Sequence, residues 1–477
     1  GKFQEAEHYL RAAIDTLTER NPNPYDGEPY YNLGVCLKWQ GRTDEAYDVF
    51  YKATWNAAQQ DAAYYAIAQI DMLRGDYEDA LDDVERSLSK NWHSLKARQL
   101  KASALRKLGR TEEALMFIED SLHIDSFNVG CLWEKYLLTN DTAIIDLMHT
   151  AMRGTAHDYI EYALDFMSAG LWEEASQLLH VYTDPAKEVY PVVLYALGYI
   201  AEMQGLRAEA KSLYQEAEKA NPAYCFPNRP EEVILLSHAI TLNPKGAKAY
   251  YYLGNFYYSK KQYAEAIDAW EKSVAIDSSF PTVLRNLALA YYNKRNDKQH
   301  ALQMMEQAFH LDETDSRIFM ELVQLYKRLG YTYQQRLDIL DKYSSLTQQR
   351  DDLMIEYVQL HNQLLRYPEA KDLLAHRHFH PWEGGEGKVT GQYTLCRREL
   401  AKQALRAGNN LEALALLAET DSYPHNLGEG KLITMQENDI DYYKGLALKA
   451  LGETDKANAF FRSATQGDSE PQQAFYY

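Results

Sequence analysis

The sequence lacks the features that several common classes of protein require. Its 477 residues include only four cysteines, Cys36, Cys131, Cys225 and Cys396, which lie far apart with no C-x-x-C pair. This spacing argues against a zinc site and a compact disulfide framework, and it predicts a protein of the reducing cytoplasm. No run of about 18 uncharged apolar residues is present, so no membrane-spanning helix is predicted.

Basic residues are also in deficit. Lys and Arg number 50 against 69 Asp and Glu, so the formal net charge is −19. A surface of this charge repels a phosphate backbone. The composition therefore predicts neither a nucleic-acid partner nor a membrane partner.

The sequence does contain an internal repeat. Gly41, Gly75 and Gly109 are each 34 residues apart, and each lies between two amphipathic runs. Glycine permits a tight turn, and the alanine that follows five positions later lets two helices approach closely. This alanine and the residue before it recur at Glu45-Ala46, Asp79-Ala80, Glu113-Ala114, Glu174-Ala175, Glu209-Ala210, Glu265-Ala266, Glu369-Ala370, Glu412-Ala413 and Lys456-Ala457.

Period, turn glycine and alanine together resemble the tetratricopeptide repeat, in eleven or twelve copies over almost the whole chain. The resemblance implies an all-α fold, a right-handed superhelical solenoid of antiparallel helix pairs. In such solenoids the first helices line a concave surface that usually binds peptides.

The repeat is interrupted once by prolines. We expect tetratricopeptide-like repeats over residues 1–220, a proline-containing irregular repeat or bend over residues 221–248, and further repeats over residues 249–477. The first residues are typical of a second helix without its first, and the last residues of the opening of another helix. We therefore expect the array to be cut at both ends.

Tyrosine recurs at one repeat position, ten residues before the turn. In the tetratricopeptide family this position faces the concave side, so the rings could form a ladder that contacts a peptide or a sugar. The alternative is packing between adjacent first helices, because the chain holds 38 tyrosines in all. The five residues are Tyr31, Tyr65, Tyr195, Tyr251 and Tyr442.

Two glycine-rich loops, residues 376–391 and 424–439, occupy equivalent positions between repeats. The sequence Gly385-Glu386-Gly387-Lys388 recurs as Gly428-Glu429-Gly430-Lys431, 43 residues later. Such loops emerge on the same edge of a solenoid, so we expect them to close on a shared ligand. Glycine amides can form an anion-binding nest, whereas carboxylates beside a tryptophan suit a carbohydrate. The candidate residues are Trp382, Glu383, Glu386, Lys388, Glu429 and Lys431.

Neither loop matches a known catalytic motif. In the first loop Trp382 replaces the first glycine of a P-loop and Val389 replaces its Ser or Thr, which excludes nucleotide hydrolysis. Three alternating histidines, at positions 376, 378 and 380, lack a fixed carboxylate or thiolate, and loop histidines of this kind are more often solvated. We therefore predict a non-catalytic chain with no metal and no cofactor. The weaker alternative is an acid and base pair for glycoside chemistry, drawn from Glu437, Asp439 and Glu383.

The second half of the chain has a further resemblance. The run from Phe379 to Val389, with Gly391-Gln392-Tyr393, Asn426 to Lys431 and Glu437 to Ile440, is similar to a family of large bacterial proteins. Its members carry an amino-terminal domain of unknown function, β-rich, ahead of tetratricopeptide repeats, and a link to carbohydrate metabolism has been suspected. The resemblance implies that the chain is the repeat region of such a protein.

These observations predict a cytoplasmic protein-interaction scaffold. Its expected partner is a peptide, another protein or the β-rich companion domain of the same parent chain, bound through the concave groove and the paired loops. The alternative is the carbohydrate-binding part of a composite glycan-processing site, completed by a missing amino-terminal domain.

Overall fold

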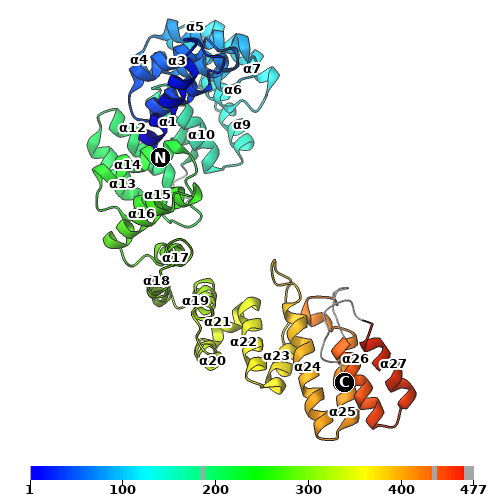
Figure 1. Ribbon diagram of the computed structural model, residues 1–477. Coiled ribbons are helices and arrows are strands. Elements are labelled where there is room, and N and C mark those ends of the chain that lie inside the picture. Colours follow the sequence, from blue (N-terminus) through cyan, green and yellow to red (C-terminus); the bar gives the residue numbers. More distant parts are fainter. Residues whose placement is uncertain (1, 184–188, 432–437, 467–477) are drawn as a thin grey trace. The chain divides into compact units, whose positions relative to one another are not determined.

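The structure is a computed structural model that describes residues 2–183, 189–431 and 438–466, and over these residues it contains helices and no strand. The chain divides into two compact units, residues 1–278 and 279–477. Each unit is built from antiparallel helix hairpins (Figure 1). The predicted all-α repeat solenoid is thereby confirmed. No helix of the described part is both long and apolar enough to cross a membrane.

The first unit begins with a single helix, α1 (Phe3–Thr18), which packs on the first hairpin. Helix α14 (Pro230–Leu242) is also single and lies between the last two hairpins in sequence. The hairpins described in this unit are α2 (Glu28–Trp39) with α3 (Thr43–Ala53), α4 (Gln60–Arg74) with α5 (Tyr77–Lys90), α6 (Leu95–Lys107) with α7 (Thr111–Ile124), α8 (Val129–Thr139) with α9 (Ala143–Met152), α10 (Ala156–Ser168) with α11 (Trp172–Tyr182), α12 (Pro191–Met203) with α13 (Arg207–Ala217), and α15 (Ala247–Ser259) with α16 (Tyr263–Ile276).

The second unit repeats the same hairpin pattern. A π-helical turn, Tyr291–Arg295, ends its first helix, and a short helix, α21 (Ser344–Gln349), follows its second hairpin. The described hairpins are α17 (Pro281–Ala290) with α18 (Lys298–Leu311), α19 (Ser316–Arg328) with α20 (Tyr333–Lys342), α22 (Asp351–Gln363) with α23 (Tyr367–His376), α24 (Lys388–Arg406) with α25 (Asn410–Ala418), and α26 (Asn438–Ala450) with α27 (Thr454–Ala464).

The recurring alanine lies where the helices of a hairpin touch. Each one is at most 1% exposed, and a side chain larger than methyl at this point would push the helix axes apart. The alanine is therefore a packing residue. The residues concerned are Ala46, Ala80, Ala114, Ala175, Ala210, Ala266, Ala370, Ala413 and Ala457.

A second small residue fixes the packing of the aromatic side chains. In four first helices a glycine seven residues before the turn faces an aromatic ring sixteen residues later, in the second helix. A Cβ atom on any of these glycines would lie only 2.3 to 2.6 Å from a ring atom, so no larger side chain fits. The pairs are Gly34 with Phe50, Gly198 with Tyr214, Gly254 with Trp270, and Gly445 with Phe461.

The turn between the two helices requires a left-handed backbone. Gly75 adopts it with φ of 86°, and the next amide, of Asp76, donates to the carbonyl of Asp71. Lys261 and Leu365 occupy the same turn with φ of 61° and 60°. Helix packing thus imposes the turn even where glycine is absent, at a cost of about 1 kcal/mol.

The predicted irregular segment, residues 221–248, contains α14. Pro230 is the first residue of this helix, and the Glu232 carboxylate accepts the backbone N–H groups of Asn228 and Arg229 at 2.6 and 2.7 Å. Proline and the glutamate together begin the helix after the irregular stretch. The segment lies inside the first unit, whose boundary with the second falls at residues 278 and 279.

Candidate functional site

Two of the five candidate tyrosines are core residues. Tyr195 is 0% exposed, and its hydroxyl donates to Glu218 Oε1 at 2.7 Å. Tyr251 is 4% exposed, and its ring centroid lies 5.3 Å from that of Tyr252. Neither ring is exposed on the surface. At these two positions the tyrosines pack inside the array, which is the alternative to a ladder of rings that contacts a ligand.

The other three tyrosines are half-buried. Tyr31 packs against Phe50 with ring centroids 5.6 Å apart, and the Tyr65 hydroxyl accepts a hydrogen bond from Gln69 at 3.0 Å. Burial, together with the charge of a nearby aspartate, raises the pKa of Tyr65 well above its ordinary value. Tyr442 belongs to the second unit. Among the four candidate tyrosines of the first unit, Tyr31 and Tyr65 are therefore partly exposed, whereas Tyr195 and Tyr251 are buried.

The structure brings the two glycine-rich loops into direct contact. The backbone N–H of Phe379 donates to the carbonyl of Asn426 at 2.8 Å. The Asn426 side chain in turn donates to the carbonyls of Leu374 and Arg377, both at 2.8 Å. The proximity inferred from the 43-residue spacing is therefore found in the described parts of both loops. A shared ligand stays a prediction.

The Glu429 carboxylate binds at the glycine amides that were predicted to form an anion-binding nest. Its Oε2 accepts the backbone N–H of Gly387 at 2.9 Å and the Thr390 hydroxyl at 3.2 Å. Gly387 is the residue before α24 and has φ of 73°. A carboxylate at a helix N-terminus is stabilised by the helix dipole. The second loop thus supplies an internal anion that holds the first loop in place.

Trp382 is half-buried and lies over its own loop. A Cβ atom on Gly385 would be 2.2 Å from the indole ring, and the ring packs against a cluster that includes Phe379, Val389 and Leu427. Residues 432–437, and with them Glu437, lie outside the described residues, whereas Asp439 forms an ion pair with Arg398. The remaining loop candidates, Glu383, Glu386, Lys388 and Lys431, have exposed side chains.

The loop histidines have separate surroundings: His376 Nδ1 lies 3.3 Å from Asp372 Oδ1, and His380 faces Asp351, the first residue of α22. His380 Nδ1 lies 3.1 Å from Asp351 Oδ2, and Arg377 forms an ion pair with the same carboxylate. Burial alone would raise the pKa of Asp351, but the hydrogen bonds from His380 and Arg377 outweigh it and hold the pKa below the usual range. Over the described residues, no group of three or more His, Cys, Asp or Glu side chains is placed to hold a metal ion.

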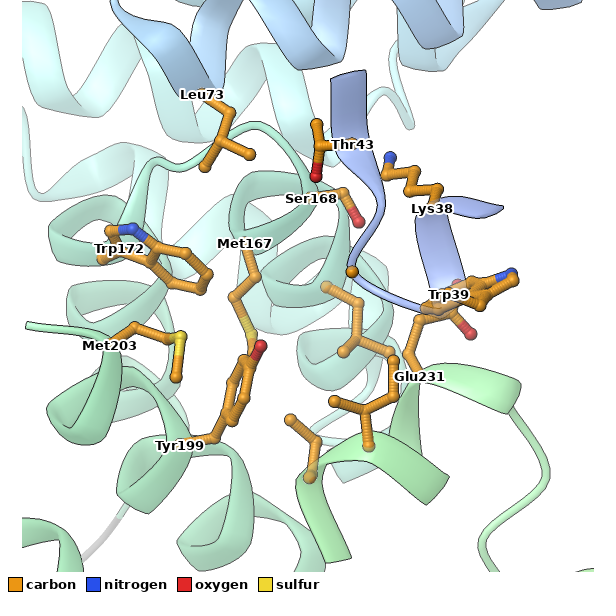
Figure 2. A pocket seen from close by; sticks show the side chains of 14 residues that line it. Lys38, Trp39, Thr43, Leu73, Met167, Ser168, Trp172, Tyr199, Met203 and Glu231 are labelled. Atoms are coloured by element: carbon orange, nitrogen blue, oxygen red, sulfur yellow. The ribbon is translucent and has the colours of Figure 1, made fainter. Parts of the chain in front are cut away.

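A cavity of about 300 Å³ lies inside the first unit (Figure 2). Trp172, Met167, Tyr199 and Met203 gather along one side of it, and Lys38, Trp39 and Glu231 lie along the other. It therefore combines an apolar wall with an edge that carries one ammonium group and one carboxylate. The lining residues come from α2, α3, α4, α10, α11, α12 and α14 and from the turn after α2.

The cavity has a simple origin in the repeat. The residue two positions before the turn glycine lines it in four hairpins, through Trp39, Leu73, Ser168 and Met203. Hairpins far apart in sequence converge here. Their close contact is seen at the turn residue Gly170, where an added Cβ atom would lie 2.8 Å from the Leu73 side chain. The curvature of the first unit thus closes the ends of its first helices around a common space.

Lys38 is the cation among the described residues that line this cavity. Its Nζ donates to Gln69 Oε1 at 2.9 Å, and no carboxylate of the described residues lies within 4.0 Å of it. Burial lowers the pKa of Lys38 to about 8, although the charges of Glu231 and Asp165 oppose the shift. Glu231 Oε2 is buried without a hydrogen-bond donor, and its nearest cation is Arg229 Nε at 3.7 Å.

The cavity was not predicted, because the one position of the first helix that was assigned to the partner-binding surface lies ten residues before the turn. The position two residues before the turn carries two large side chains, Trp39 and Met203, and one leucine, Leu73. The recurrence of large apolar side chains at this one repeat position could have indicated a shared apolar surface. It could not have shown that the first, second, fifth and sixth hairpins meet.

Comparison with known proteins agrees with this architecture. A family described as TPR repeat matches residues 254–294, and one described as tetratricopeptide repeat matches residues 235–268. The chain contains tetratricopeptide repeats. Repeats of this type form scaffolds for protein interaction. The resemblance to large bacterial proteins with an additional domain stays a prediction.

One curated relative is BBSome complex member BBS4 from Bos taurus, which is 23% identical over 339 residues. The match covers 68% of this chain and 60% of that protein, so the chain spans less than two thirds of the relative's length. Among solved structures, MamA from Desulfovibrio magneticus RS-1 is 21% identical over 41% of this chain and 97% of its own, with a TM-score of 0.24. PilF from Pseudomonas aeruginosa is 16% identical over 46% of this chain and 89% of its own, with a TM-score of 0.26.

Proposed function

We propose that the chain is a scaffold that binds a segment of a protein partner on the first-helix face of its first unit. The observation that carries the proposal is the convergence of first helices from non-adjacent hairpins around one partly apolar space. A space of this kind binds a chain segment because it offers large apolar area with a few fixed polar groups. The related protein from Bos taurus is named as a member of a complex, which supports a role in assembly.

The polar residues of this face are already held in position. Lys96 Nζ lies 2.8 Å from Asp165 Oδ1, and Arg229 Nη1 lies 2.8 Å from Glu161 Oε1. These ion pairs join α6 to α10 and α10 to the residue before α14. Side chains that are ordered before binding lose less conformational entropy when a partner arrives. The face is therefore suited to recognition of a defined segment.

The paired loops of the second unit form a second candidate surface. Their exposed side chains Glu383, Glu386 and Lys388 are accessible to the companion domain predicted from the bacterial resemblance. No observation favours the carbohydrate alternative. The Trp382 ring packs on Gly385 and on the apolar cluster, and Glu429 is engaged by Gly387.

Site-specific photo-crosslinking tests the proposal. A photoreactive phenylalanine analogue replaces Tyr65, on the first-helix face, or Met116, which is 72% exposed on the second helix α7. After irradiation in cells of the source organism, the same partner protein should be captured from position 65 and not from position 116. A third position, Glu386, tests the paired loops. Capture from positions 386 or 116 without capture from position 65 would refute a partner site on the first-helix face.

A further inference from the structure

The cavity of the first unit is suited to a single large side chain. Its wall contains two indole rings, Trp39 and Trp172, and two flexible thioethers, Met167 and Met203. Methionine side chains adapt to the shape of an inserted group, and aromatic rings offer large apolar faces. A volume of about 300 Å³ is at the lower limit for a ligand pocket and admits one bulky apolar group.

The charged edge of the cavity determines which charge a bound ligand should carry next to its apolar group. Glu231 lies in the first turn of α14, where the helix dipole stabilises a carboxylate, and Arg229 is 3.7 Å away. Lys38 has no carboxylate of the described residues within 4.0 Å, and its ammonium group donates to the neutral amide of Gln69, while Glu231 and Asp165 act on it from farther away. A buried ammonium group gains more from an incoming carboxylate than a compensated carboxylate gains from an incoming cation.

We propose that this cavity binds one segment of a protein partner, which inserts a large apolar side chain between the tryptophans and places an adjacent carboxylate on Lys38. The inference rests on the proposed scaffold function and specifies the chemistry of the segment. The carboxylate forms a charge-assisted hydrogen bond with the Lys38 ammonium group. The lowered pKa of Lys38 agrees with this assignment, because an ion pair inside the cavity would raise it again.

Methyl NMR spectroscopy of the full chain tests the inference. The probes are acetylated, amidated tetrapeptides of sequence Gly-Phe-Glu-Gly, with Gly-Phe-Gln-Gly, Gly-Phe-Lys-Gly and Gly-Ala-Glu-Gly for comparison. The chain has 11 methionines, and the methyl signals of Met167 and Met203 report directly on the cavity. The Phe-Glu peptide should shift both signals and should bind at least fivefold more tightly than the Phe-Gln and Ala-Glu peptides.

Three variants assign the effect to residues. Lys38→Met should reduce the affinity for the Phe-Glu peptide to that of the Phe-Gln peptide, while the dispersion of the methyl spectrum shows that the fold is retained. Glu231→Gln should change this affinity less than twofold. Met203→Trp adds a ring at a partly exposed position, fills the cavity and should abolish binding of all four peptides.

Several outcomes would overturn the inference. If the Phe-Lys peptide bound most tightly, Glu231 and not Lys38 would determine the charge of the ligand, and the partner segment would be basic. Binding of free 3-phenylpropionate as tight as that of the peptide would assign the cavity to a small-molecule acid. Absence of any shift at Met167 and Met203 with every probe would exclude a side-chain site. Crosslinking from position 65 is independent of these results, so failure of the cavity and failure of the scaffold proposal are distinguishable.

Discussion

Gly254→Ala tests the packing rule of the hairpins. A Cβ atom at this position would lie 2.3 Å from both Cδ1 and Nε1 of Trp270, far inside van der Waals contact. The ring has little freedom to move, because Trp270 is 3% exposed and its Nε1 donates to the Tyr251 carbonyl at 3.1 Å. Either α15 and α16 separate or the indole leaves its position and its hydrogen bond.

The expected magnitude follows from three contributions. Overpacking of a dense core costs about 1–3 kcal/mol, and loss of the indole hydrogen bond costs about 1 kcal/mol. Alanine inside a helix returns roughly 0.5–1 kcal/mol relative to glycine. The variant should therefore be less stable than the wild-type chain by about 1–3 kcal/mol.

Local stability is the proper readout, because repeat arrays unfold in parts. Hydrogen exchange followed by mass spectrometry should show faster exchange in peptides from α15 and α16, and urea unfolding should begin at a lower concentration. The matched control is Gly391→Ala in α24, where no heavy atom lies within 4 Å of the added Cβ. This control should stabilise α24 by roughly 0.5–1 kcal/mol. If both variants stabilised their helices, the close approach of Gly254 to Trp270 would be refuted.

Three further outcomes are expected. Burial, with Asp83 beside it, raises the pKa of Asp71 to about 7. The folded state then retains a proton that the unfolded chain loses above about pH 4, so stability should fall from pH 4 to pH 7. Asp71→Asn should reduce this decline, to which Asp83 with its pKa raised to about 6 also contributes. The free energy of unfolding of the variant should exceed that of wild type by roughly 2–4 kcal/mol at pH 8 in urea titrations, and a flat wild-type profile would contradict this expectation. Glu429→Ala should accelerate amide exchange around Gly387, where it removes an acceptor at 2.9 Å, and unchanged exchange would exclude a clamp. Glu218→Ala should destabilise the start of α15 by about 1 kcal/mol, because Glu218 accepts the Lys248 N–H at 2.8 Å, and normal exchange there would contradict this role.

The hairpins could be predicted from sequence because their contacts are local. Glycine and aromatic ring are separated by sixteen residues in each of four hairpins, as in Gly254 with Trp270, so one 34-residue window contains both partners. The contact between the glycine-rich loops was predictable for a similar reason. Their shared motif, at Gly385 and Gly428, fixes an equivalent place in neighbouring repeats.

The cavity could not be predicted in the same way. Trp39 and Met203 line it together, although more than four repeats separate them in sequence. Their meeting depends on the rotation accumulated over all the intervening hairpins. One of these, α8 with α9, turns at Asn140 (φ 55°) and lacks the usual glycine. Small differences in each hairpin add up along a solenoid, so no local pattern determines which first helices converge.

Removal of the Lys38 charge should change stability and binding in opposite directions. In the third hairpin the position of Trp39 is taken by Lys107, whose ammonium group pairs with Glu174 at 2.6 Å. The fold thus pairs one lysine at the end of a first helix with a carboxylate, whereas the Lys38 ammonium group donates to an amide oxygen and has no carboxylate of the described residues within 4.0 Å. Its pKa of about 8 lies below that of an unfolded lysine, so at neutral pH its charge costs the folded state up to about 3 kcal/mol. Lys38→Met should therefore raise the free energy of unfolding at pH 7, and the gain should vanish as pH rises above 10. A loss of stability in this variant would show that Lys38 supports the fold, whereas a gain accompanied by lost peptide binding is the behaviour of a residue retained for its ligand.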